Sequence, residues 1–274
     1  MLKIQKEKIL TWFVTGASSG FGHNLSLKLL ERGYNVVCVS RSVPNIVHDN
    51  CLCLSCDVTN VESVKKTIGL ALERFKKIDV LSNNAGISAS IMLEDENLEH
   101  MKEVMNTNFF GSFNTMNLLI PHFRNNKNGT IINNTSQSGI SHRAMGSAYV
   151  SSKHALEGLT SVCWYETHKF CRVMALELGY YRGTGILKEA KKQLPRFEEY
   201  KIPSFYRPFK RNFSNNIDIA VNKLINVVEL KDMPRRLMLG KDAMFQIGAE
   251  IEDLKRDYLR CYKDSLECSI DVAE

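Results

Sequence analysis

The stretch Thr15-Gly16-Ala17-Ser18-Ser19-Gly20-Phe21-Gly22 decides the fold. It joins a short apolar run, residues 9–15, to a helical pattern that begins near His23. Three glycines let the backbone turn tightly and approach a ligand closely, and the helix that follows offers unpaired N–H groups at its first turn. A pyrophosphate fits such a turn, so the segment predicts a dinucleotide-binding loop between the first strand and the first helix.

Outward from this turn, short β-branched runs alternate with longer helical patterns along the whole chain. This alternation predicts an α/β fold, a Rossmann-like doubly wound parallel sheet flanked by helices on both faces. The expected strands are residues 9–15, 35–40, 51–56, 79–83, 130–134, 173–177 and 236–239. The expected helices are 23–32, 61–75, 98–124 (two helices or one bent helix), 149–170, 216–230 and 242–266.

The 274 residues, 44% apolar and 24% charged, are enough to bury a substantial core. No low-complexity linker and no repeat divides the sequence, so we expect a single domain over residues 1–274. The irregular stretch at about 180–215 contains three of the six prolines. Long irregular segments in compact domains are often functional, so this stretch is the expected substrate lid.

The net charge of +6 is concentrated in the expected lid, where residues 180–212 carry nine Lys and Arg against three acids. The lid also holds Phe197, Tyr200, Phe205, Tyr206 and Phe209. Two interpretations stay open: a solvated surface loop with its aromatic side chains turned inward, or a cover for an apolar substrate that bears an acidic group. No nucleic-acid-binding motif accompanies the charges, so no nucleic acid partner is expected.

The chain begins with lysines and an apolar run, residues 10–14, that is too short for a signal peptide or a membrane span. We therefore expect a cytoplasmic protein with no membrane span, whose eight cysteines are reduced. Cys51, Cys53 and Cys56 suggest zinc, but no second cysteine or histidine cluster has ligand spacing. The sequence therefore predicts no metal site.

Several motifs follow the glycine turn in a fixed order. The turn itself has the spacing Gly-x-x-x-Gly-x-Gly, and Asn83-Asn84-Ala85-Gly86 follows the fourth expected strand. Ser136 follows the fifth strand, and Tyr149-x-x-x-Lys153 comes thirteen residues later. In these motifs the whole chain resembles the short-chain dehydrogenase/reductase family.

The resemblance implies an NAD(P)-dependent enzyme that interconverts carbonyl and alcohol groups of a small molecule. It also implies which positions bind the cofactor, namely Gly16, Ser18, Ser19, Gly20, Phe21, Gly22, Arg41, Asp57, Val58, Asn84, Ala85, Gly86, Tyr149, Lys153 and Gly179. The family usually has Pro-Gly after the sixth strand, whereas this chain has Leu178-Gly179, and Thr184 is displaced by a residue. The residues that would contact the nicotinamide ring are therefore the least well defined part of the expected cofactor site.

Tyr149 and Lys153 can also be argued from geometry. An offset of four residues places both side chains on one face of a helix. A free tyrosine has a pKa near 10, and a nearby ammonium favours the phenolate. We therefore expect Lys153, together with an oxidised cofactor, to lower the pKa of Tyr149 toward neutrality.

The resemblance implies four catalytic residues. Tyr149 is the general acid in carbonyl reduction, Ser136 hydrogen-bonds the substrate oxygen, Lys153 holds the nicotinamide ribose, and Asn108 supports a water-mediated proton path. Ser138 competes for the serine role. Only Ser136 stands thirteen residues before the tyrosine and three before a glycine.

Cofactor choice depends on the end of the second strand, where an acidic side chain would bind a free ribose 2′-hydroxyl. This chain has Ser40-Arg41-Ser42 there, without an acid. A guanidinium suits a 2′-phosphate, so NADP(H) is favoured over NAD(H). Asp57, by the resemblance, contacts the adenine end.

Other interpretations remain. A homo-oligomer, a dimer or tetramer paired through the helices near residues 98–119 and 149–162, rests on the resemblance alone. A catalytically inactive NADP(H)-binding sensor or scaffold would keep the fold without the chemistry, although it has little use for Ser136, Tyr149 and Lys153 together. A sugar-nucleotide epimerase or dehydratase uses the same tyrosine and lysine, but typically in a longer chain with another glycine spacing.

Overall fold

The computed structural model describes residues 9–181, 184, 191–192, 199–200 and 215–268. Most of the expected lid at 180–215 therefore lies outside the described residues, including Phe197, Phe205, Tyr206 and Phe209. Within the described part, no helix combines the length and the apolar character needed to cross a bilayer.

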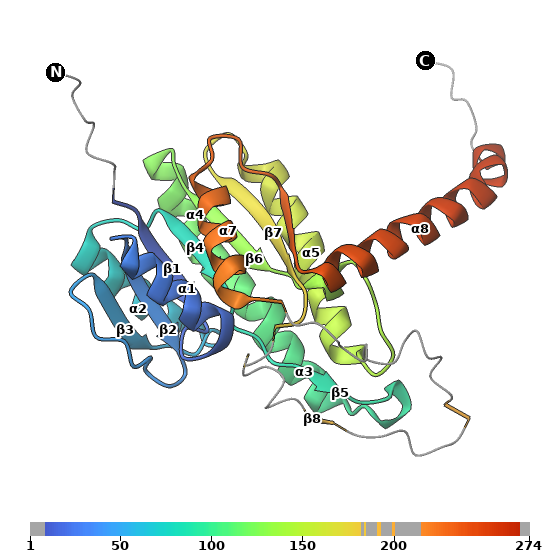
Figure 1. Cartoon of the computed structure of the whole chain (residues 1–274), viewed down its shortest axis with the longest axis horizontal. Helices are drawn as coiled ribbons and strands as arrows, with labels where there is room; N and C mark the ends of the chain where they lie inside the picture. The colour runs from blue at the N-terminus through green and yellow to red at the C-terminus, as the bar shows by residue number, and fades with distance from the viewer. Residues whose placement is uncertain (1–8, 182–183, 185–190, 193–198, 201–214, 269–274) are drawn as a thin grey trace.

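The centre of the structure is one sheet with the strand order β3-β2-β1-β4-β6-β7-β9 (Figure 1). All neighbouring strands are parallel. The order reverses between β1 and β4, the switch point at which ligand crevices open in such sheets. The α/β fold and all seven expected strands are confirmed, with bounds β1 (Thr11–Thr15), β2 (Asn35–Ser40), β3 (Cys51–Ser55), β4 (Val80–Asn83), β6 (Thr130–Asn134), β7 (Arg172–Leu178) and β9 (Arg236–Leu239).

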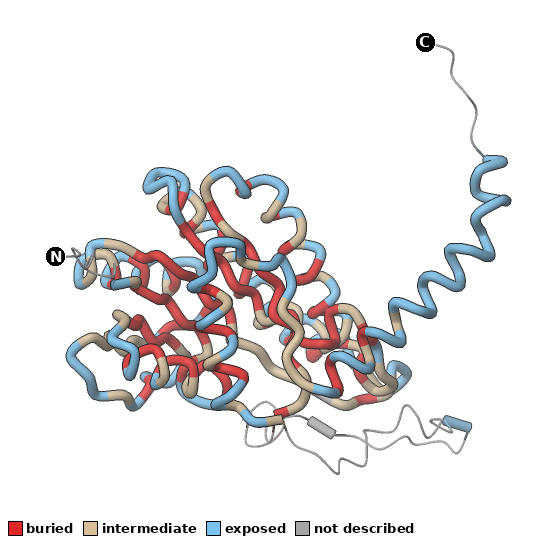
Figure 2. The backbone as a smooth tube through the Cα atoms, turned by 45° about the horizontal axis from the view of Figure 1, so that its top comes forward, coloured by how far each residue is buried: buried red, intermediate tan, exposed pale blue. Residues whose placement is uncertain are grey.

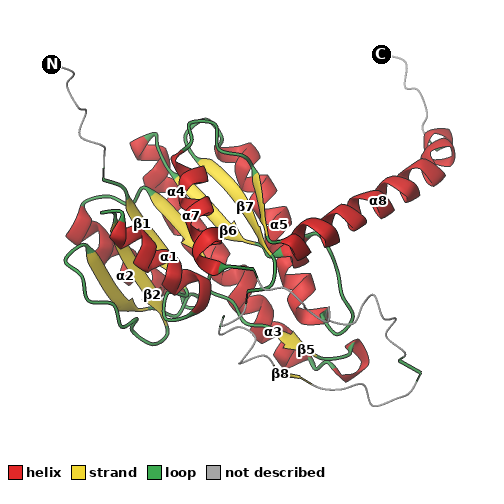
Figure 3. Ribbon diagram, in the orientation of Figure 1, coloured by secondary structure: helices red, strands yellow, loops and turns green. Residues whose placement is uncertain are grey.

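Helices cover both faces of the sheet (Figure 3). Helices α1 (Gly20–Glu31) and α7 (Ile217–Glu229) pack on one face, and α2 (Val61–Phe75), α4 (Gly111–Asn126) and α5 (Ser147–Thr167) pack on the other. Alternate side chains of strand β1 belong to the hydrophobic cores on opposite faces of the sheet. Trp12 and Val14 join the core under α1 and α7, whereas Phe13 points the other way, into the core under α2 and α4.

The expected helix over 98–124 is one bent helical segment made of three parts. α3 (Leu98–Met105) continues through the π-helical turn η2 (Asn106–Phe110) into α4. A π turn inserts an extra residue, which changes the direction in which nearby side chains point, and such turns occur often at functional sites. Here it contains Asn108, which is fully buried.

Several short elements carry no sequence period and were not expected. They are β5 (Ala89–Ser90), which pairs with β8 (Lys191–Lys192), and the 3-10 turns η1 (Leu93–Asp95) and η3 (Gln137–Gly139). The last helix, α8 (Lys241–Glu267), packs on the body only at its start and then projects away from it (Figure 1).

A buried carboxyl group lies in β7. Glu177 is fully buried, and its Oε1 accepts a hydrogen bond from Arg236 Nη1 at 2.8 Å. Burial, and then the nearby charge of Glu157, raise the pKa of Glu177 to about 7, although Arg236 opposes the shift. The folded state therefore binds the proton of Glu177 more tightly than the unfolded state does. The contribution of this protonated carboxyl group to the free energy of unfolding is complete below about pH 4.5 and is lost as pH rises through about 7.

We expect Glu177→Gln, which keeps the shape of the protonated form, to unfold at nearly the same free energy as the wild type at pH 4.5. At pH 8 the variant should be more stable by up to about 3 kcal/mol. Urea unfolding at both pH values measures the difference, with the exposed Glu252→Gln as control. A stability difference that does not change with pH would contradict the assignment.

Candidate active site

A cavity of about 620 Å³ opens at the carboxyl ends of the strands, a volume typical of small-molecule and cofactor sites. Segments that follow six of the seven strands contribute to its wall. Most of the expected site residues line it: Gly16, Ser18, Ser19, Gly20, Phe21, Gly22, Arg41, Asp57, Val58, Asn84, Ala85, Gly86, Ser136, Tyr149 and Gly179. Lys153 and Asn108 do not line the cavity.

The glycine turn closes one side of the cavity by packing backbone on backbone. Gly16 has φ +67°, and a Cβ there would lie 2.9 Å from the backbone of Ala85. A Cβ on Gly22 would lie 2.6 Å from the carbonyl oxygen of Gly16. Neither position has room for a side chain, so both glycines are required by the geometry.

The first turn of α1 faces this cavity with its N–H groups uncapped. The N-cap residue Ser19 makes no side-chain capping hydrogen bond, and the first turn contains no acidic residue. Together with the positive end of the helix dipole, these N–H groups suit an anionic ligand such as a pyrophosphate.

A threonine that sequence reasoning did not single out joins the glycine turn to the segment after β4. Thr15 Oγ1 accepts hydrogen bonds from Asn84 N at 3.0 Å and Ala85 N at 3.1 Å. Next to it, Asn84 Oδ1 is buried and has no hydrogen-bond partner. A buried acceptor without a partner at a cavity wall fits a donor supplied by a ligand.

Tyr149 and Ser136 meet at another wall of the cavity. Tyr149 comes from the first turn of α5, and it is hydrogen-bonded to Ser136. Ser136 has a φ of +61°, which is unusual for a residue with a side chain. The conformation is stabilised by hydrogen bonds from Thr135 N and Ser136 N to Leu176 O, at 3.1 and 3.2 Å.

The choice between the two serines is consistent with this geometry. Ser138 does not line the cavity, and its backbone N–H donates to Ser136 Oγ at 3.3 Å. Ser138 therefore holds Ser136 through its backbone N–H and does not contribute to the cavity wall.

Lys153 lies behind Tyr149, one turn later in α5. It is buried, its Nζ donates to Asn134 O at 2.6 Å, and the same atom lies 5.7 Å from the centre of the Tyr149 ring. Burial lowers the pKa of Lys153 to about 8. Its proton is therefore exchangeable near neutral pH.

Asn108 is fixed by three hydrogen bonds. Its Oδ1 accepts from Ile87 N at 2.8 Å, and its Nδ2 donates to Ile87 O at 3.0 Å and to Ser152 Oγ at 2.9 Å. It thereby ties the π turn to the segment after β4 and to α5. The expected water-mediated proton path through Asn108 stays a prediction.

The expected lowering of the Tyr149 pKa is not produced by the protein's own groups. Burial raises the pKa of Tyr149, and the hydrogen bond with Ser136 and the charge of Arg143 oppose that shift only in part. Burial also lowers the pKa of Lys153, to about 8, so the lysine still carries its charge at neutral pH but does not reverse the shift of Tyr149. The phenol is therefore protonated at neutral pH.

Two further residues that the sequence did not single out hold the wall after β7. Asp242, buried in the first turn of α8, accepts a hydrogen bond from Tyr180 N at 2.7 Å and another from Asn215 Nδ2 at 2.7 Å. Asn215 Nδ2 also lies 2.8 Å from Tyr180 O. This network fixes the backbone beside Gly179, and Thr184 lines the same cavity.

At the opposite end of the cavity, Arg41 is exposed and lies between Ser40 and Ser42, which also line the wall. Asp57 Oδ1 accepts hydrogen bonds from Thr59 N at 2.9 Å and Thr59 Oγ1 at 2.8 Å. α3 contributes charged lining residues that the sequence did not indicate: Glu99, Lys102 and Glu103.

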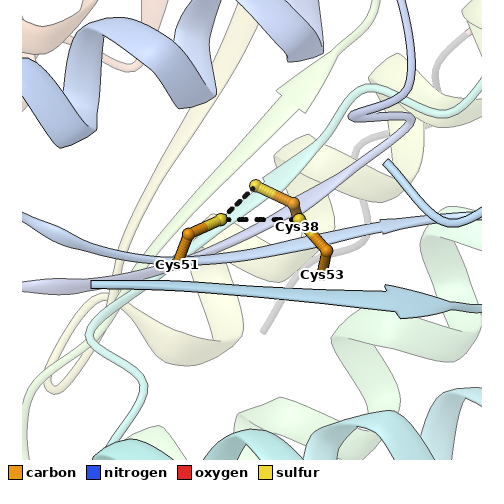
Figure 4. A group of neighbouring side chains, drawn as sticks. All are labelled: Cys38, Cys51 and Cys53. Carbon is orange, nitrogen blue, oxygen red and sulfur yellow. Dashed lines mark hydrogen bonds between the residues drawn. The ribbon is translucent and has the colours of Figure 1, made fainter. Parts of the chain in front are cut away.

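The cysteines group differently from the expected triplet. Cys51 Sγ lies 3.6 Å from Cys38 Sγ and 3.5 Å from Cys53 Sγ (Figure 4), whereas Cys56 accepts a hydrogen bond from Thr67 instead. The largest cause that raises the pKa of the Cys51 thiol is its hydrogen bond with Cys38, followed by burial. For the Cys53 thiol the largest cause is burial, and its pKa rises to about 11. Structural zinc sites take four ligands, and among the described residues only these three donors gather here. The expectation of no metal stays a prediction.

Cysteine thiols that are protonated and partly buried should react slowly with a maleimide. In a Cys261→Ser/Cys268→Ser variant, which removes the two exposed cysteines, the six remaining thiols should react with a maleimide at least about 100-fold more slowly than free cysteine at pH 7.5. All six should react after unfolding. Rapid labelling of Cys51 or Cys53 in the folded protein would contradict the neutral cluster.

Comparison with known proteins gives a consistent picture. The family profile described as short chain dehydrogenase matches residues 11–195. An uncharacterized oxidoreductase of Schizosaccharomyces pombe is 29% identical over 260 residues, covering 91% of this chain and 88% of the relative. A 3-ketodihydrosphingosine reductase of Bacteroides thetaiotaomicron is 36% identical over 157 residues, covering 57% of this chain and 58% of the relative.

Solved structures agree. A short-chain dehydrogenase from Streptomyces avermitilis superposes with a TM-score of 0.88 at 26% identity, covering 96% of this chain and all of that one. A short chain dehydrogenase from Burkholderia cenocepacia, solved in complex with NADP, has a TM-score of 0.72 at 24% identity and covers 92% of this chain and 96% of that one. The Burkholderia cenocepacia structure, at this identity, shows that the two proteins share the fold.

Proposed function

Because this chain belongs to the short-chain dehydrogenase family of oxidoreductases, we propose that it transfers hydride between NADPH and the carbonyl carbon of a small ketone or aldehyde, or runs the reverse oxidation. The observation that carries the proposal is the joint position of Tyr149 and Ser136 on the wall of the cavity whose other wall is the glycine turn. Lys153 lies directly behind the tyrosine.

Family members bind a nicotinamide cofactor, and the residues here fit one. The glycine turn and the uncapped first turn of α1 would hold the pyrophosphate. The unpartnered Asn84 Oδ1 would accept a hydrogen bond from the cofactor. When bound, the reduced nicotinamide supplies the hydride.

The protein's part of the reaction is to place and protonate the substrate oxygen. Ser136 would hold the carbonyl oxygen by a hydrogen bond, and the protonated phenol of Tyr149 would donate the proton as negative charge develops there. The raised pKa of Tyr149 suits this role, because the group arrives at the reaction in its acid form. Lys153, with a pKa of about 8, would return a proton to the tyrosine at neutral pH.

Cofactor selectivity for NADP(H) rests on Arg41. It lies at the end of β2 on the cavity rim, between Ser40 and Ser42, and no acidic residue stands in this triplet. A guanidinium there can form charge-assisted hydrogen bonds with a 2′-phosphate. The Burkholderia cenocepacia neighbour was solved with NADP, which is consistent with this choice.

Loss of the tyrosine hydroxyl tests the mechanism. Tyr149→Phe should lower kcat by about 10² to 10⁴-fold, because general acid catalysis contributes that much, and should leave NADPH binding nearly unchanged. Turnover is followed by NADPH oxidation over a panel of ketones, aldehydes and quinones, including a long-chain 3-ketone. Unchanged turnover would defeat the mechanism, and a wild type that binds NADPH but reduces nothing in the panel would favour the sensor or scaffold.

The cofactor proposal has its own test. Arg41→Ala should raise the Kd for NADPH by about ten- to a hundred-fold, corresponding to the loss of hydrogen bonds to a charged group, while the Kd for NADH stays the same. Titration of cofactor fluorescence measures both constants. Arg124→Ala, an exposed change at the far end of α4, serves as control. An equal effect on both cofactors would exclude a 2′-phosphate contact.

Association of copies is also part of the proposal. α4 and α5 carry exposed apolar side chains on their outer faces, among them Phe113, Val162 and Tyr165. Exposed apolar patches of this kind mark interaction surfaces, and they support a dimer or tetramer formed through these helices. The cytoplasmic location and the role of residues 180–215 as a lid remain predictions.

A further inference from the structure

The last helix of the chain is a long amphipathic helix without a partner in the described structure. Its first turns are anchored by Asp242, Ala243 and Ile247, which are buried. All residues from 251 to 268 are exposed, and the helix extends away from the body (Figures 1 and 2). Most of the stability of helices in proteins comes from packing of an amphipathic face, so the exposed portion is expected to have a packing partner.

The exposed part carries an apolar stripe. Ile251, Leu254, Tyr258 and Tyr262 recur at intervals of three or four residues, so they share one face, and each is between 46% and 62% exposed. Leu259 and Leu266 border the same stripe. Such a stripe is the seam along which helices pack side by side.

The charged residues that flank the apolar stripe indicate which partner would pack on it. With Ile251 and Tyr258 at heptad positions a, the g positions are Glu250, Asp257 and Asp264, and the e positions include Lys255 and Tyr262. In a parallel pair of identical helices, each g position faces an e position of the other helix. Glu250, which also contacts His142 of its own chain at 3.0 Å, then faces Lys255, and Asp257 faces a Tyr262 hydroxyl.

An antiparallel pair would be disfavoured, because it would place the row of g acids against the same row of acids in the second copy. A membrane surface also fits poorly. Residues 248–267 contain six acids and four basic residues, whereas helices that lie on anionic lipid have polar faces rich in Lys and Arg.

We propose that α8 is a pairing helix, which packs in parallel against α8 of a second copy of this chain. Cys261 occupies the next d position after Leu254, so the pairing places the two Cys261 thiols opposite one another. The contact uses a different part of the molecule from the outer faces of α4 and α5. The two contacts together would build a tetramer.

A cross-linking experiment on the full chain tests the pairing. In a Cys268→Ser background, Cys261 is the one exposed cysteine left on α8, and a short bis-maleimide should join two chains into a covalent dimer. Adding Cys261→Ser should abolish the product. Adding Leu254→Ser should reduce it at least tenfold, whereas the matched change Arg260→Ser on the opposite face should not. Lys255→Glu should also reduce it, because two acids would then face each other.

Other results would overturn the proposal. A dimer or tetramer in light scattering that gives no Cys261 cross-link would place assembly on other surfaces only. A cross-link that Leu254→Ser leaves unchanged would exclude the stripe. Co-sedimentation with vesicles of anionic phospholipid that is lost in Leu254→Ser, without any cross-link in the parent, would assign the stripe to a membrane. NADPH binding by Leu254→Ser should match the wild type, which separates this proposal from that of the cofactor site.

Discussion

The site depends on the close approach of two backbone segments at the point where the strand order reverses. The turn after β1 and the turn after β4 come so near each other that Gly16 cannot carry a side chain, and the hydroxyl of Thr15 binds both amides of Asn84 and Ala85. This contact fixes the floor of the cavity. The N–H groups of α1, the amide of Asn84 and, through Asn108 and Ile87, the helix α5 all take their positions relative to it.

The chemistry of the site follows from burial more than from attraction between charges. Lys153 and Tyr149 are close, yet each is shifted toward its neutral form, the lysine to a pKa of about 8 and the tyrosine above its usual value. The Lys153 ammonium is thereby the stronger acid of the two, so a proton would move from it to a Tyr149 phenolate. Ser136, held at a positive φ by two amides bonded to Leu176 O, supplies the fixed hydrogen bond in this arrangement.

Much of this could be predicted from the sequence, because the information is local. The alternation of apolar runs and helical patterns predicted all seven strands of the main sheet, and the spacing of the glycines predicted the turn after β1 that lines the cavity. Most of the other lining residues were expected from the resemblance to the family. Contacts between distant segments were not predictable. Thr15, Asn215 and Asp242 act through partners 27 to 70 positions away, and Cys38 joins Cys51 only because β2 and β3 are neighbours. The π turn was equally hidden, since one extra residue in a helical turn leaves no mark on hydrophobic periodicity. The contribution of desolvation to the Tyr149 pKa was not predictable either, because it depends on three-dimensional packing.

The carboxylate of Asp242 connects two parts of the structure. It belongs to the first turn of α8, and it also binds the backbone of Tyr180 and the amide of Asn215 at the cavity wall. A rotation of α8 about its base would therefore carry that wall with it, on the side where the segment after β7 borders the ligand. The base of α8 is thus part of the support of the cavity wall, and a displacement of this helix would reach the segment after β7 through the Asp242 carboxylate.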